Sequence, residues 1–125
     1  MAQGGVVIAG ERFIVELADT PPLQARGLGG RAHLGANRGM LFVYAQRERH
    51  TFWMKDMLIP IDIIWLDNTR VVHIEHRVPP PAPGTPDWRL PTYRPPRPAN
   101  LVLELPAGRA AALGLRVGSE VELIF

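Results

Sequence analysis

The sequence predicts a mainly β fold: a single compact antiparallel β-sandwich or barrel-like domain with two short helices. Most apolar residues fall in short runs rich in β-branched and aromatic side chains, and turn residues separate these runs. Only two segments carry helix signals. The chain has 125 residues, the size of one ordinary domain, so residues 1–125 are expected to form a single β domain.

The chain is expected to begin with a β-hairpin. Residues 6–8 and 13–17 are apolar runs, and the second places Phe13, Val15 and Leu17 on one face. The four residues that join the runs include a glycine, as is typical of a hairpin turn. Further strands are predicted at residues 39–44, 50–55, 61–66, 70–78, 100–105 and 121–124.

Two short helices are predicted from their end signals. Asp19 and Thr20 can cap a helix that starts at Pro21, and the glycines from Gly27 onward keep it short. The second helix lies within 106–114, which starts with proline, contains three consecutive alanines and ends with glycine.

The proline-rich segment 79–98 is predicted to be an extended surface loop within the domain. It contains nine prolines, which exclude a helix or a central strand. It also carries Trp88, Leu90 and Tyr93, which a simple spacer does not need. We therefore expect this loop to pack back onto the domain, where it could also contact a protein partner.

The composition excludes several kinds of site. The chain has no cysteine, and its single serine, Ser119, lies in a predicted turn, which argues against thiol and serine-hydrolase chemistry. His73 and His76 are three residues apart, so on a strand they point to opposite faces and cannot share a metal ion. No metal or cofactor is therefore expected.

The charge gives little support for a nucleic-acid partner. Thirteen arginines and one lysine leave a net charge of only +2, although the pI is about 9.7. The arginines are scattered, whereas nucleic-acid binding usually needs a clustered basic surface. No nucleic-acid partner is therefore expected.

The sequence leaves the compartment open. No apolar run approaches the roughly 18–20 residues that span a bilayer, so no transmembrane segment is expected. The first residues lack the charged and apolar regions of a secretory signal. Such a start is compatible with a cytoplasmic protein and with an exported or cell-envelope domain whose leader has been removed.

Two acids lie inside apolar strands. By alternation Asp62 shares a face with Ile64 and Leu66, so it is expected in the core or in a cleft. Its structural alternative is an acid that holds loop backbone or an arginine. Glu104 shares a face with Val102 and is expected on a half-exposed sheet face. If the two carboxyls approached within about 5–10 Å, they would have the geometry of a glycoside-cleaving pair.

Lys55 and Arg26 are candidate ligand contacts. Lys55 follows the aromatic residues Phe52 and Trp53, so its ammonium group could rest on an indole face, or it could be an ordinary surface lysine. Arg26 precedes a glycine-rich turn and could bind an anionic ligand or tie this turn to an acid.

The chain resembles the uncharacterised bacterial and archaeal family known as domain of unknown function 192. The matching pieces are residues 26–28, 39–43, 52–55, 59–63 and 103–108 and the late Gly118. The resemblance implies a mainly β, sandwich-like domain and, because many relatives carry a leader or anchor, it is compatible with export. It implies no established activity. The family pattern falls on the candidate residues Arg26, Trp53, Lys55, Asp62 and Glu104.

The leading functional hypothesis is a small ligand-binding or accessory module rather than an enzyme. An aromatic and charged cleft would hold a sugar-like or other small polar ligand. The candidate contacts are Arg26, Trp53, Lys55, Asp62, Trp88 and Tyr93. One alternative is an acid/base hydrolase or lyase that uses Asp62 and Glu104 with Lys55. Another is a structural or partner-binding domain that docks through residues 79–98.

Overall fold

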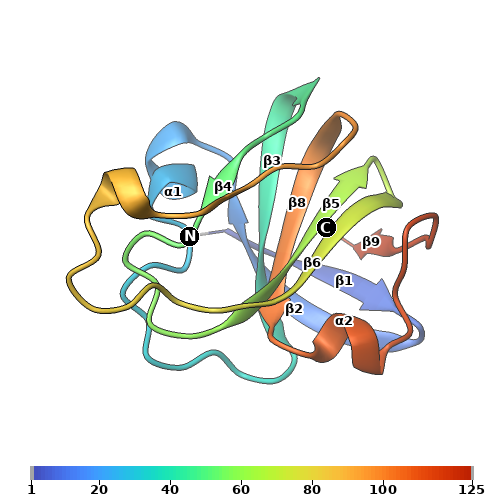
Figure 1. The fold of residues 1–125 in the computed structure, drawn as a ribbon. Helices are drawn as coiled ribbons and strands as arrows, with labels where there is room; N and C mark the ends of the chain where they lie inside the picture. The colour runs from blue at the N-terminus through green and yellow to red at the C-terminus, as the bar shows by residue number, and fades with distance from the viewer. Residues whose placement is uncertain (1, 125) are drawn as a thin grey trace.

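The computed structural model describes residues 2–124, which form nine strands, two short helices and one 3-10 turn (Figure 1). The elements are β1 (Gln3–Ile8), β2 (Glu11–Ala18), α1 (Pro21–Arg26), β3 (Arg38–Glu48), β4 (Phe52–Trp53), β5 (Ile61–Asp67), β6 (Arg70–Val78), η1 (Asp87–Arg89), β7 (Thr92–Tyr93), β8 (Ala99–Pro106), α2 (Arg109–Ala112) and β9 (Glu122–Ile124).

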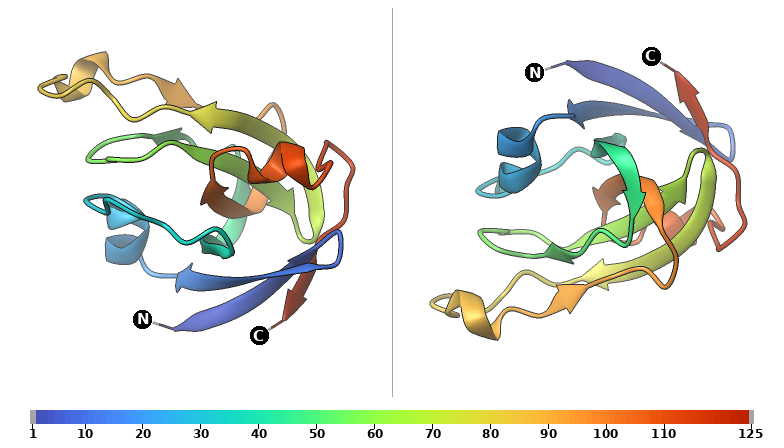
Figure 2. Two further views of the ribbon diagram at one scale, coloured as in Figure 1. Left: turned by 90° about the horizontal axis from the view of Figure 1, so that it is seen from below. Right: turned by 90° about the horizontal axis from the view of Figure 1, so that it is seen from above.

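Seven strands form one strongly curled sheet in the order β6-β5-β8-β3-β2-β1-β9. Neighbouring strands are antiparallel except for β2 and β3, which are parallel. The sheet bends into a half-barrel (Figure 2), and the chain leading into β9 forms a bridge between Glu120 and Arg70 at the start of β6. Strands β4 and β7 pair separately. The predicted mainly β, barrel-like fold is confirmed.

Several elements differ in extent from the prediction, and the largest differences are in β3, β4 and α2. Strand β3 runs on to Glu48, beyond the expected 39–44, because after an irregularity it pairs again with β8 at Ala99. The strand expected at 50–55 is reduced to the two residues of β4, which pair only with the short β7. The helix expected within 106–114 comprises only Arg109–Ala112.

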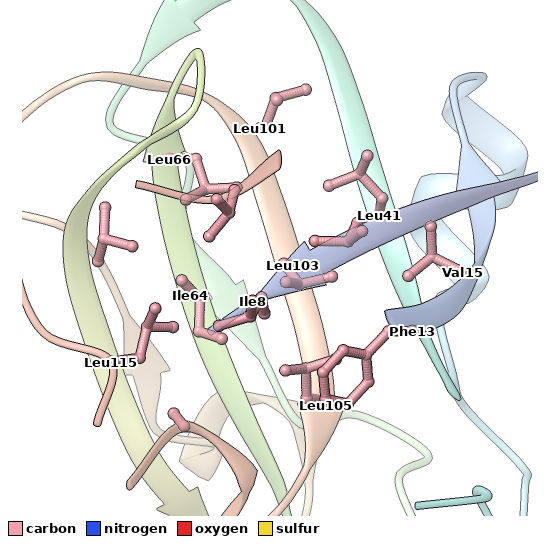
Figure 3. Close-up of a cluster of buried hydrophobic side chains, with 14 residues drawn as sticks. Ile8, Phe13, Val15, Leu41, Ile64, Leu66, Leu101, Leu103, Leu105 and Leu115 are labelled. Carbon is pink, nitrogen blue, oxygen red and sulfur yellow. The ribbon is translucent and has the colours of Figure 1, made fainter. Parts of the chain in front are cut away.

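The two faces of the central strands β3, β8 and β5 are both apolar. On one face Leu41, Leu103 and Ile64 lie in register, and they belong to a cluster that also receives side chains from β1 and β2. Figure 3 shows this cluster inside the curl of the sheet. On the other face Phe42, Val102 and Trp65 form the corresponding row.

The second face is covered by connecting segments rather than by another sheet. Buried side chains from the segment 49–60 and the turn after α1 pack on it, together with the half-buried Tyr93 of β7. The buried side chains are Leu28, Phe52, Met54 and Met57. The covering segments and α1 gather at one end of the molecule (Figure 2).

A close approach of β3 and β8 sets the position of Glu104. A Cβ atom on Gly39 would collide with the backbone carbonyl oxygen of Glu104 and lie 2.9 Å from Cδ2 of Leu105. Only a residue without a side chain therefore allows the two strands to pair closely here.

We expect Gly39→Ala to lower the free energy of unfolding by about 1–3 kcal/mol, because the added methyl group forces the two strands apart. Urea unfolding followed by circular dichroism measures this loss. Gly35→Ala is the matched control, since its added Cβ would meet only the flexible side chain of Arg38 at 3.4 Å. Equal losses in the two variants would contradict the prediction.

Candidate functional site

A cavity of about 280 Å³ lies between α1, the middle of β3 and the segment that contains β4. Its polar and aromatic lining includes Gln24, Arg26, Tyr44, Trp53, Lys55 and Glu104, and we call it the Glu104 pocket. Arg26 and Lys55 are exposed, whereas Glu104 is buried. The carboxyl group therefore lies at the inner end of the pocket and the two basic groups lie at its mouth.

Glu104 is a carboxyl group in an apolar setting. On β8 it lies in register between Met40 of β3 and Ile63 of β5, both of which are fully buried. Only 4% of Glu104 is exposed. Burial raises the pKa of this carboxyl to about 8, and no neighbouring cation or hydrogen-bond donor opposes the effect. The group is therefore largely protonated at neutral pH.

The prediction that Glu104 lies on a half-exposed sheet face is wrong. Alternation correctly places it beside Val102 and opposite Leu103. The connecting segments that cover this face are distant in sequence, so the pattern of β8 alone does not reveal them. Their cover buries Glu104 and leaves it at the inner end of the pocket.

Tyr44 forms part of the pocket wall beside Glu104. Burial and, to a smaller extent, the negative charge of Glu104 raise the pKa of the Tyr44 phenol. Its ring stacks on His50, with centroids 3.7 Å apart and planes at 15°. Gln24 fixes α1 over the pocket, because its amide nitrogen donates to the carbonyl oxygens of Ala18 and Val43 at 3.2 and 2.8 Å.

The mouth of the pocket combines an aromatic ring with two basic side chains. Trp53 is 43% exposed, and Nζ of Lys55 lies 5.4 Å from the centre of its ring. Lys55 also donates a hydrogen bond of 2.8 Å to Asp87 in the 79–98 segment, and this bond raises the pKa of Lys55. Arg26 takes part in no ion pair within residues 2–124.

Asp62 lies outside this pocket and binds backbone. Its Oδ1 accepts hydrogen bonds from the N–H groups of Arg77 and Gly108 at 2.8 and 3.1 Å, and its Oδ2 accepts one from Ala110 at 2.8 Å. The side chain is fully buried. This is the structural alternative that the sequence left open, an acid that holds loop backbone.

The geometry does not support an acid/base pair of Asp62 and Glu104. Asp62 pairs in register with Leu105, which faces the first cluster, whereas Glu104 pairs with Ile63, which faces the second. Because side chains alternate along a strand, the two carboxyls point to opposite faces of the sheet. They therefore cannot flank one substrate, and this geometry contradicts the hydrolase hypothesis that is based on Asp62 and Glu104.

The two aromatic candidates from the 79–98 segment also lie outside the pocket lining. Trp88 is 79% exposed and has the guanidinium group of Arg89 5.1 Å from its ring centre. Tyr93 pairs with Phe52 across β4 and β7 and packs on the second cluster. A protein partner for the 79–98 segment stays a prediction.

Three polar residues of the pocket lining were not predicted from the sequence. Tyr44 has the same strand parity as Met40 and Phe42, which places it on the second face, but the pattern does not distinguish a pocket wall from core. Gln24 lies on the short helix α1 and Thr51 lies just before β4, and no local pattern marks either residue. Their roles follow from the packing of α1 and β4 on the sheet.

Residues 2–124 show neither a clustered metal site nor a membrane-spanning helix. No group of three or more His, Cys, Asp or Glu side chains in this range is placed to hold a metal ion. None of the helices in the same range is long and apolar enough to cross a membrane.

Comparison with known proteins places the chain among uncharacterised relatives. Residues 5–123 match the model of DUF192, a family described as "Uncharacterized ACR". No curated protein matches. A crystal structure from Sinorhizobium meliloti 1021, of a protein described as a candidate transcription regulator, is 26% identical with a TM-score of 0.85, over 98% of this chain and 94% of that one. A protein of unknown function from Novosphingobium aromaticivorans DSM 12444 is 33% identical with a TM-score of 0.80, over 97% and 84%.

Proposed function

Since this chain belongs to the DUF192 family, which is described as uncharacterised, we propose its function from the geometry of the Glu104 pocket. We propose that this pocket binds a small polar ligand that is sugar-like or of similar size. The observation that carries the proposal is the carboxyl of Glu104, which is buried at the inner end of an accessible pocket without a compensating partner. Such a group costs stability, and a ligand that hydrogen-bonds to it offsets that cost.

The rest of the pocket supports binding of a small molecule. Small-molecule sites are usually concave, with apolar walls, a few polar groups and volumes from about 300 Å³ upward. The Glu104 pocket lies near the small end of this range. Its apolar walls include Phe42, Phe52 and Met57, and Trp53 offers a ring face at the mouth. The lining contains one carboxyl group, which favours binding over two-carboxylate catalysis.

The proposal is tested by thermal shift and calorimetry with glucose, glycerol, lactate and glycine as probes of four ligand classes. We expect at least one class to bind, and Trp53→Ala to weaken that binding about tenfold, which corresponds to ~1.4 kcal/mol. Trp88→Ala is the matched control, because this tryptophan is outside the pocket lining. Binding by no class, or equal losses in both variants, would overturn the proposal.

The description of the Sinorhizobium meliloti relative raises nucleic-acid binding as a second function. The net charge of +2 gives this chain little electrostatic attraction for a polyanion. Binding to random duplex DNA with a steep dependence on salt would favour this second function.

A further inference from the structure

The inner end of the Glu104 pocket lacks a positive charge. None of the ion pairs within residues 2–124 includes Glu104, and neither Arg26 nor Lys55 contributes to its pKa. A carboxylate in an apolar setting is stabilised most by a cation that is held in contact with it. The protein itself does not supply that cation, so a ligand can.

The wall around the carboxyl is suited to a compact cation. Four aromatic side chains line the pocket, namely Phe42, Tyr44, Phe52 and Trp53. Aromatic ring faces attract ammonium groups, whereas they cannot satisfy the many hydroxyl groups of a sugar. The inner end therefore offers one carboxyl group and aromatic surface, an environment that suits a single ammonium group once the carboxyl has released its proton.

The mouth of the pocket has the opposite preference. Lys55 is neutralised by Asp87, but Arg26 has no acidic partner within residues 2–124. A guanidinium group at the mouth repels a second positive charge and pairs well with a carboxylate. The outer end of the ligand is therefore expected to be anionic.

We propose that the Glu104 pocket binds a small zwitterion of the amino-acid type, whose protonated amine contacts the Glu104 carboxylate and whose own carboxylate faces Arg26. This inference rests on the proposed binding function and specifies its ligand class. It differs from binding of a neutral sugar, in which Glu104 would stay protonated and donate a hydrogen bond.

The two modes of binding differ in the number of protons that binding releases to solvent. With a pKa of about 8, Glu104 carries roughly nine-tenths of a proton at pH 7, and an ammonium ligand displaces this proton to solvent. The affinity for an amine should therefore rise about tenfold per pH unit up to pH 8 and then level off. A neutral ligand held by the protonated carboxyl gives no such release.

The expected proton release and pH dependence must come from Glu104 and not from other titratable groups near it. Burial raises the pKa of Tyr44 and the bond to Asp87 raises that of Lys55, so neither of the two groups changes charge between about pH 6 and 8. Arg26 is the remaining charged group of the lining. His50, another titratable side chain, stacks on Tyr44, so Glu104→Gln is needed to identify the source of any proton release.

The test is isothermal titration calorimetry in buffers of different ionisation enthalpy. The probes are glycine, β-alanine, γ-aminobutyrate and ε-aminocaproate, which vary the distance between the two charged ends. Butyrate lacks the amine and butylamine lacks the carboxylate, so together they test each end of the ligand. Glucosamine and glucose form a second matched pair. Each probe is measured at pH 6, 7 and 8 with wild-type protein and with Glu104→Gln and Arg26→Gln.

We expect at least one amino acid of the series to bind and to release roughly 0.9 proton at pH 7. Glu104→Gln should weaken that binding at least about tenfold and abolish the proton release, and Arg26→Gln should reduce affinity without changing the release. Tighter binding of glucose than of any amine, without proton release and sensitive to Trp53→Ala, would overturn this inference and leave the binding function intact. Binding of none of the amines would overturn this inference, and binding of none of these probes, nor of glycerol or lactate, would overturn both.

Discussion

Replacing Asp62 with alanine should lower the free energy of unfolding by about 3–6 kcal/mol. The substitution leaves three backbone N–H groups, those of Arg77, Gly108 and Ala110, without their acceptor. A buried N–H group left unsatisfied costs about 1–3 kcal/mol, and the N–H groups of Arg77 and Gly108, whose hydrogen bonds are only partly buried, lie toward the lower end of this range. A domain of this size has a total stability of only about 5–15 kcal/mol, so Asp62→Ala removes a large fraction of it.

The backbone that Asp62 holds is itself strained. Arg77 has a φ of +50° although it is not glycine, and Gly108 has a φ of +93°. The pairing of β5 with β6 shifts register between Ile61 and Ile63, next to Asp62, as expected for a β-bulge. One carboxylate oxygen therefore fixes two left-handed residues, one in the bulge of β6 and one at the start of α2.

Urea unfolding of three variants tests this role. Asp67→Ala lies on the same strand and removes only the exposed ion pair with Arg47, so its loss should stay below about 1 kcal/mol. Asp62→Asn keeps the shape and one acceptor oxygen, and its loss should fall between the other two. If Asp62→Ala and Asp67→Ala lost equal stability, the carboxylate of Asp62 would not organise this backbone.

The fold was predictable because alternation is a local property. Within each of the runs at 13–17, 61–66 and 100–105, the order of the residues alone shows which side chains share a face of the strand. The structure has strands at all three runs. The parallel pairing of β2 with β3 was not predictable. The alternation of apolar residues along a strand is the same in both chain directions, so it does not show whether two strands pair parallel or antiparallel. The length of β4 was overestimated. The apolar residues at 50–55 include side chains such as Met54, which cover the sheet rather than extend it.

The candidate site was predictable only in part. Arg26, Trp53 and Lys55 do line one pocket with Glu104, although they come from α1, the β4 segment and β8. In the sequence, Asp62 and Glu104 are both single acids within apolar strands. Their different roles depend on what meets each face: the N–H groups of a bulge and a helix start for Asp62, and the pocket for Glu104. Neither partner is near in sequence.

Replacing Glu104 with glutamine should stabilise the protein, and increasingly so as the pH rises. The folded protein holds the Glu104 proton up to a pKa of about 8, whereas the ordinary value is 4.5. Between these values the folded state binds more protons than the unfolded state, so stability falls with rising pH. The fall is about 1.4 kcal/mol per pH unit, or ~5 kcal/mol in total. Below pH 4.5 this contribution to stability is fully present.

Urea unfolding of the wild-type protein and Glu104→Gln from pH 5 to 8 measures this effect as a difference between the two. The advantage of the variant should grow by about 4 kcal/mol over this range. Glu16→Gln is the matched control, because its difference from the wild-type protein should stay nearly constant from pH 5 to 8 and change only in more acidic solution. The hydrogen bond from Arg31 lowers the pKa of Glu16, so Glu16 stabilises the fold above pH 4.5 and this contribution is lost in acid.

The stability and binding experiments on Glu104 together decide why this carboxyl is present. A core position between Met40 and Ile63 would be filled more stably by a neutral side chain, so folding alone does not require an acid there. A variant that gains stability at pH 8 and loses ligand binding identifies Glu104 as a functional group maintained at a cost in stability. If the advantage of Glu104→Gln did not change with pH, the carboxyl would be ionised and solvated in the folded protein, and the pocket would lack the uncompensated acid from which its ligand is inferred.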